Sequence, residues 1–166
     1  MKFKLFGVLV FYFVSFYALS DVPIDYPETI LTYDENRKFC ALTTQTESTI
    51  FEKSCRFGKI LYEVEGWHPK VFLLQQGTLF VSIYPGLNLV PLEQPLETII
   101  IETWHDGVKS HEIKLSDLVT SIDALERSSS NYNWGHMKGL SGELLNFQTN
   151  EGSVSVNLQS GKVQFN

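Results

Sequence analysis

The sequence predicts a mainly β protein: an antiparallel β-sandwich or partly open barrel built of hairpins, with one short α-helix near residues 116–127. Short runs rich in β-branched and aromatic residues recur along the chain, which favours strands. Turn-forming pairs such as Asp106-Gly107 and Ser160-Gly161 separate these runs at hairpin spacing. No linker or low-complexity stretch divides residues 21–166, so we expect a single domain there.

The expected strands are short and follow one another closely. They cover residues 28–33, 37–43, 49–55, 60–64, 71–74, 78–84, 97–104, 108–114, 143–149, 153–158 and 162–165. The turns Phe57-Gly58-Lys59 and Ser160-Gly161-Lys162 resemble each other, as turns in propeller blades do. The chain is too short for a full propeller, but blade-like packing of its sheets stays open as an alternative.

One segment has the pattern of a helix. Ser116-Asp117 would supply an N-cap and an acidic first turn, and the apolar residues Leu118, Val119, Ile122 and Leu125 would share one face. Residues 131–142 follow without any period, and we expect a long surface loop there.

The N-terminus has the three parts of a secretory signal peptide. Lys2 and Lys4 precede an apolar run, and Ala18-Leu19-Ser20 places small residues before a cut at Asp21. The alternative is an uncleaved membrane anchor, but the apolar run from Leu5 to Leu19 is shorter than the roughly 20 residues a spanning helix needs. We therefore expect residues 1–20 to be removed and residues 21–166 to be periplasmic or secreted.

The chain has two cysteines, Cys40 and Cys55. In an exported protein this pair predicts a disulfide, and a hairpin turning midway between the two cysteines would place them opposite each other. A metal-binding or nucleophilic role is the alternative, but neither a C-x-x-C motif nor a nearby histidine supports it.

The charge is acidic. Thirteen Lys and Arg against 19 Asp and Glu give −6, and removal of Lys2 and Lys4 leaves 11 against 19, which is −8. This balance argues against nucleic-acid binding. An acidic surface favours a basic partner through complementary fields, whereas the alternative is that the charge only keeps the protein soluble.

The sequence contains no G-x-S-x-G, H-E-x-x-H, P-loop or G-x-G-x-x-G motif. We therefore expect no cofactor and favour a non-enzymatic protein. A Ser–His–Asp set assembled by the fold stays open, because such sets are defined by geometry and not by sequence position.

Tryptophans and histidines occur together in an unusual way. The candidate binding residues are Trp67-His68, Trp104-His105 and Trp134-Gly135-His136. If their loops met at one end of the sandwich, three imidazoles able to hold Zn²⁺ would be surrounded by indoles able to stack on sugars or cations. The alternative is that the tryptophans pack at the core rim and the histidines are solvated, so we expect no metal ligands.

Two further features have two interpretations each. Leu87, Leu89 and Val90 form either an exposed apolar ridge that binds a partner or a plug at one end of the core. The acidic residues at positions 93, 97 and 102 form either a negative patch or the solvated face of a strand.

These observations favour an exported, non-enzymatic binding protein, such as an inhibitor or immunity-type protein for a basic partner. The first alternative is a small metal-dependent or hydrolytic enzyme with a Trp/His-lined site, and the second is a structural subunit of an envelope assembly. The sequence gives no indication of oligomeric state, and a membrane contact is expected only through an uncleaved leader.

The leader generates a first prediction. The full chain, expressed in a host with a general secretion system, should be recovered from the exported fraction with Asp21 as its first residue. N-terminal sequencing and intact mass measure this directly. A product that keeps Met1 and stays with the membrane would contradict the prediction.

Overall fold

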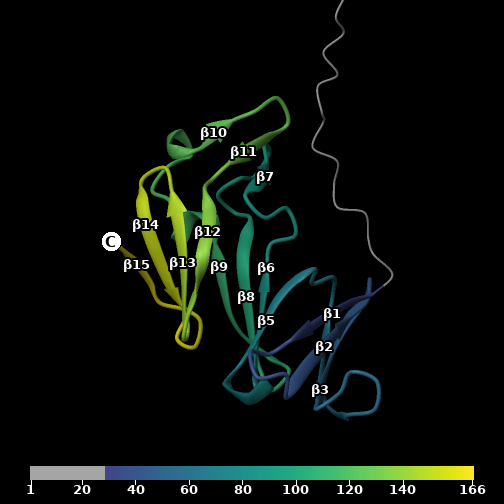
Figure 1. The fold of residues 1–166 in the computed structure, drawn as a ribbon. Helices are drawn as coiled ribbons and strands as arrows, with labels where there is room; N and C mark the ends of the chain where they lie inside the picture. The colour runs from purple at the N-terminus through teal and green to yellow at the C-terminus, as the bar shows by residue number, and fades with distance from the viewer. Residues whose placement is uncertain (1–28) are drawn as a thin grey trace, which may run out of the picture.

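The computed structural model describes residues 29–166, and the expected signal peptide and its cleavage site lie outside them (Figure 1). This part of the chain forms four antiparallel sheets, which confirms the all-β sandwich of hairpins. Within the described range, no helix has the length and apolarity needed to cross a membrane.

Three sheets are four-stranded and one is small. The N-terminal sheet consists of β1 (Ile30–Tyr33), β2 (Phe39–Thr43), β3 (Glu47–Glu52) and β4 (Lys59–Glu65). The central sheet consists of β5 (Lys70–Leu74), β6 (Leu79–Ile83), β8 (Ile99–His105) and β9 (Val108–Lys114). The C-terminal sheet consists of β12 (His136–Ser141), β13 (Leu144–Thr149), β14 (Gly152–Asn157) and β15 (Val163–Phe165). The small sheet joins β10 (Glu126–Arg127), β11 (Asn131–Asn133) and β7 (Leu89–Pro91).

The central sheet lies between the other two four-stranded sheets (Figure 1). All five residues of β6 are buried, as expected for a strand covered on both faces, and its one polar side chain, Ser82, is hydrogen-bonded. Successive side chains of a strand point to opposite faces. Val81 accordingly packs in the cluster shared with the C-terminal sheet, while Phe80 packs in the cluster shared with the N-terminal sheet.

Two polar contacts tie the N-terminal sheet to the central one. The Tyr62 hydroxyl of β4 donates a hydrogen bond to the Gly77 carbonyl, at 2.5 Å, in the 3-10 turn η1 (Gln75–Gly77). His68, in the connection between the sheets, bonds to Ser82 of β6 at 2.9 Å. Both contacts lie at the apolar interface and fix how the two sheets are placed.

The three four-stranded sheets repeat one connectivity. Each is a meander of neighbouring strands, and a glycine lies in the turn before the last strand: Gly58, Gly107 or Gly161. The similar sequences around Gly58 and Gly161 thus occupy equivalent positions. The meanders stack face to face, as blades of a propeller do.

The Asp106-Gly107 hairpin forms as the sequence predicts. Both residues have positive φ, 49° and 80°, which is the requirement of a type I′ turn. His105 pairs with Val108 directly across the turn.

The expected helix near residues 116–127 is wrong. Its place is taken by two 3-10 turns, η2 (Leu115–Asp117) and η3 (Ile122–Ala124), and Ser121 between them is extended. The Glu151 carboxylate accepts the backbone N–H of Thr120 at 2.6 Å, a donor that a continuous helix would have used internally. The apolar residues Leu118, Val119 and Leu125 are nevertheless buried in the core, so the periodicity reported burial and not helix.

The expected surface loop over residues 131–142 is also wrong. It contains the whole of β11 and β12, and β11 pairs with β7. Trp134 between them is buried, packs on Phe147 and donates its indole N–H to the Leu87 carbonyl at 3.0 Å. Of the apolar residues 87, 89 and 90, Val90 is fully buried in the core, whereas Leu87 is exposed.

The disulfide between Cys40 and Cys55 is confirmed, with Cα atoms 5.7 Å apart. Its predicted place, directly across a hairpin, is wrong. Cys40 of β2 lies opposite Phe51 of β3, and Cys55 follows after the end of β3. The backbone reverses at Lys53, whose φ of 74° is left-handed, and brings Cys55 back over the sheet.

Removing this disulfide should weaken the fold. For a loop of 15 residues, Cys40→Ala with Cys55→Ala should lower the free energy of unfolding by roughly 3 kcal/mol. Equilibrium unfolding in urea measures the change, and the reduced wild type should unfold like the double variant. An unchanged urea midpoint in both samples would contradict this expectation.

Candidate functional site

An open groove of about 620 Å³ lies where the N-terminal sheet stops covering the central sheet. It is lined by the end of β4, the connection that follows it, and the β8–β9 hairpin. The lining residues are Glu63, Val64, Glu65, Gly66, Trp67, His68, Glu102, Trp104, Gly107 and Lys109.

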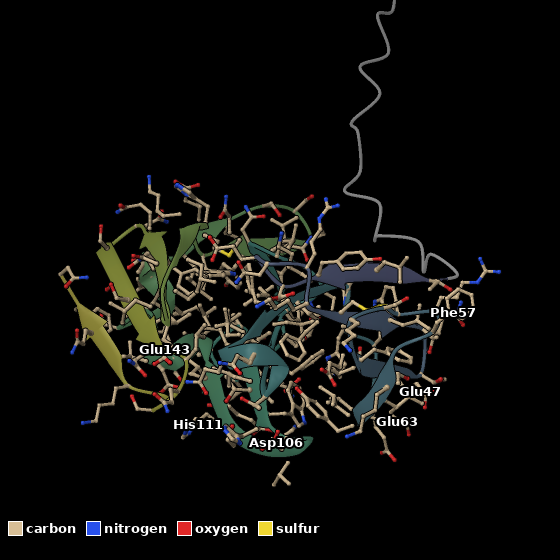
Figure 2. All side chains as sticks on the ribbon, turned by 60° about the horizontal axis from the view of Figure 1, so that its bottom comes forward. Glu47, Phe57, Glu63, Asp106, His111 and Glu143 are labelled. Carbon is tan, nitrogen blue, oxygen red and sulfur yellow. A yellow bond between two sulfur atoms is a disulfide. The ribbon has the colours of Figure 1, made fainter. Side chains whose placement is uncertain are left out.

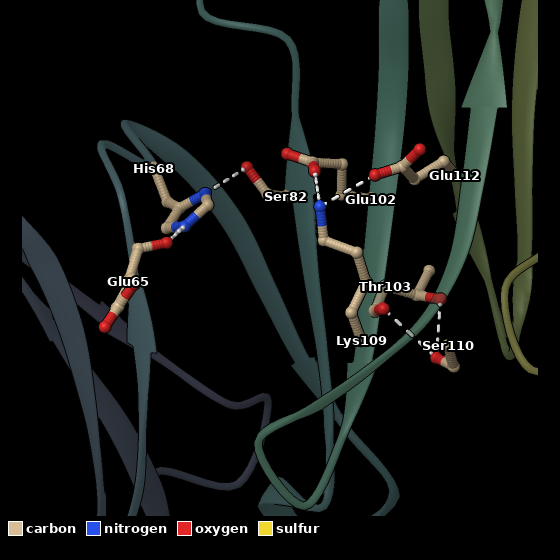
Figure 3. Close-up of polar contacts among 8 residues, drawn as sticks. All are labelled: Glu65, His68, Ser82, Glu102, Thr103, Lys109, Ser110 and Glu112. Carbon is tan, nitrogen blue, oxygen red and sulfur yellow. Dashed lines mark hydrogen bonds and ion pairs between the residues drawn. The ribbon is translucent and has the colours of Figure 1, made fainter.

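A lysine ammonium lies at the rim of this groove, with its side chain 45% exposed (Figure 3). Lys109 Nζ lies 2.6 Å from Glu102 Oε1 and 2.7 Å from Glu112 Oε1. It also lies 5.4 Å from the ring centroid of Trp104, within the range of a cation–π contact. The hydrogen bonds that Lys109 donates to Glu102 and, next in size of effect, to Glu112 raise the pKa of Lys109, so the ammonium stays charged.

A β-bulge places Lys109 there. The register between β8 and β9 shifts between Thr103 and Trp104, so that Trp104 pairs with Lys109. Ser110 is the extra residue of the bulge and has no paired residue on β8. Its hydroxyl bonds to the Thr103 hydroxyl at 2.9 Å and donates to the Thr103 carbonyl at 3.1 Å. Because a shift of one residue moves a side chain to the other face of a sheet, the bulge brings the ammonium onto the face of the indole.

A second hollow of about 300 Å³ continues the groove along β8. Trp67 and Glu102 line both spaces. Glu97 lines the second space and forms an ion pair with Lys114 at 2.5 Å. Of the three acidic positions interpreted either as a patch or as the solvated face of a strand, Glu97 and Glu102 share one hollow, and Glu93 is not part of its lining.

His68 lies beneath the groove and is almost completely buried. Its Nε2 lies 2.9 Å from the Glu65 carbonyl, which can only accept, so Nε2 carries the proton. Nδ1 then accepts a hydrogen bond from the Ser82 hydroxyl at 2.9 Å. Burial lowers the pKa of His68, and the ring meets Trp104 and Phe80 edge to face. His68 is thus a hydrogen-bonded core histidine in its neutral form.

The structure separates the other predicted site residues. His105 is exposed at the end of β8 and pairs with Asp106 at 3.2 Å. His136 is exposed on β12 of the C-terminal sheet, while Trp134 beside it is buried in the core. His111 bonds to the Gln159 carbonyl at 3.1 Å. Trp67, His68 and Trp104 are brought together at the groove; His105, Trp134 and His136 are not part of its lining.

The two carboxylates and the indole face suit an organic cation, such as an ammonium group, rather than a metal ion. Within residues 29–166, no three His, Cys, Asp or Glu side chains gather in a way that could hold a metal. The sequence pointed to the tryptophans and to Glu102 but missed Lys109 and Glu112. Their contribution depends on the bulge, which no residue pattern in the hairpin announces.

No protein-family model matches the chain, and its sequence matches no curated protein.

The neutral state of His68 generates a prediction about pH. Its pKa is lowered in the folded protein, so the unfolded chain binds more protons below the ordinary value of 6.5. Stability should therefore fall as pH decreases from about 6.5 toward the folded-state pKa of His68. His68→Asn should be less stable at pH 7 by about 2–4 kcal/mol, because it leaves a packing gap and broken hydrogen bonds.

The slope identifies the residue. His68→Asn should show a shallower loss of stability with falling pH than the wild type, measured by urea unfolding across this pH range. His136→Asn, at an exposed position, is the control and should keep the wild-type slope. Equal slopes in the wild type and His68→Asn would contradict the assignment.

Proposed function

We propose that this chain is an exported binding protein whose groove binds a basic group of its partner, a lysine or arginine side chain. The observation that carries the proposal is the cage around Lys109, where two carboxylates and an indole face hold an ammonium. Carboxylates and indole faces also bind the lysine or arginine side chains of other proteins.

The charge of the lining supports the same ligand class. Two carboxylates, at Glu97 and Glu102, line the two spaces, against one lysine. Glu63 and Glu65 border the groove, but strand alternation turns their side chains to the outer face of the N-terminal sheet. The combined groove suits several side chains of a peptide segment more than a single ion. The net charge of the chain adds long-range attraction for a basic partner.

Export is supported by two features. The first residues have the pattern of a signal peptide. The disulfide is consistent with an oxidising compartment. An inhibitor or immunity-type protein that binds a basic exported protein would fit these properties.

Binding can be tested with a short oligolysine peptide as the probe. Tryptophan fluorescence should report saturable binding at low salt, weakened as ionic strength rises. Glu102→Gln should weaken binding roughly three- to fivefold, since it removes one carboxylate of the cage. Lys109→Met should tighten it by a similar factor, because the internal ammonium no longer competes for Glu102 and Glu112.

Glu126→Gln is the matched control. It removes the same charge from an exposed position on β10, in the small sheet, and should leave the affinity within about twofold of wild type. If both glutamate variants weaken binding equally, the probe senses only net charge and the groove is not the site. Weaker binding by Lys109→Met would also overturn the proposal.

A further inference from the structure

The outer face of the N-terminal sheet, turned away from the central sheet, is apolar and exposed. Strand pairing places Tyr33, Cys40, Phe51 and Ile60 in one row on this face, and Leu31 and Leu42 in the next. Cys40 within the row is fully buried and is joined by its disulfide to Cys55. Leu31 and Ile60 are each 53% exposed, and Tyr33 is 45% exposed. Phe57, in the turn before β4, is 83% exposed at one end of the face.

The opposite end of the stack has a different surface. The outer face of the C-terminal sheet carries a polar ladder, in which Ser155 donates to Asn146 at 2.8 Å and Ser153 donates to Gln148 at 3.1 Å. Figure 2 shows Phe57, Glu47 and Glu63 at one end of the molecule and Glu143 toward the other. A polar outer face is what ends a stack of sheets, so the apolar face is the end that lacks a cover.

Charges are divided between the two ends of the apolar face. At the end with the turns before β2 and β4, Arg37 lies over the Tyr33 ring at 5.9 Å and Arg56 over the Phe57 ring at 5.2 Å. At the other end, Glu47 of β3 lies directly opposite Glu65 of β4, and Glu63 follows on the same face. Directly opposed like charges destabilise a sheet. Among residues 29–166, no ion pair involves any of these five side chains.

We propose that this face binds a second copy of the chain, packed face to face with its strands reversed. A two-fold axis in the plane of contact then lays the arginine end of each copy over the glutamate end of the other. The apolar centres meet as the sheets inside each copy already do. The same contact gives Glu47 and Glu65 the cations that their own chain does not supply.

The size of the face sets the expected affinity. Four strands spaced about 4.8 Å apart give a face of roughly 20 by 20 Å. Two such faces bury roughly 800 Å², which is below the range of stable specific interfaces, so we expect a weak, reversible dimer with a dissociation constant in the high micromolar range.

Sedimentation of the full chain, as recovered after export, tests the proposal over low to high micromolar concentrations. The wild type should shift from monomer to dimer. Ile60→Asp should weaken the dimer at least about tenfold by placing a charge among the exposed apolar side chains of the face. Leu144→Asp makes the same change at an exposed leucine of the C-terminal sheet and should not alter the dimer.

Charge reversal distinguishes this pairing from general stickiness. Arg56→Glu and Glu47→Lys should each weaken the dimer at least about threefold, and the double variant should return to within about twofold of wild type. These substitutions do not alter Glu102 or Lys109, so dimerisation and oligolysine binding can fail independently. A protein that stays monomeric at all concentrations overturns the proposal. Another occupant, either residues 21–28 or an unrelated partner, would then cover the face. A dimer unaffected by Ile60→Asp also overturns it.

Discussion

Burial of the central sheet on both faces is the constraint on which the rest of the structure depends. A strand such as β6, with every residue buried, must be covered twice, so the chain supplies one four-stranded sheet before it and one after it. The two apolar clusters lie on opposite faces of that sheet. The N-terminal sheet does not cover the whole face of the central sheet, and the groove lies where this coverage ends.

The sequence was informative where local chemistry decides structure. The Asp106-Gly107 turn, the strands on either side of it and the disulfide partners follow from residue types and spacing alone. The predicted helix is wrong because its apolar spacing does not require a helix. Leu118, Val119 and Leu125 are buried in the core by a chain path that contains two 3-10 turns. A distant carboxylate, that of Glu151, then took a backbone donor the helix needed.

The candidate site depends on contacts between two sheets and on a register shift within one of them. Neither can be predicted from the spacing of residues along the chain. Trp67 and His68 lie in the connection between the N-terminal and central sheets, and both line the groove. The similar pairs at Trp104 and Trp134 did not bring their histidines to it. In each of those pairs the tryptophan packs inward while the histidine is exposed.

The joint between the N-terminal and central sheets contains two groups that each require one protonation state. His68 must be neutral to remain buried, and Tyr62 must keep its proton to donate to the Gly77 carbonyl. Burial, with a smaller effect from Asp106, raises the pKa of Tyr62, so alkali above its ordinary value of 10 disfavours the joint just as acid below 6.5 does. The two sheets are thus held together most firmly in a neutral window, and both extremes of pH weaken the same joint between them.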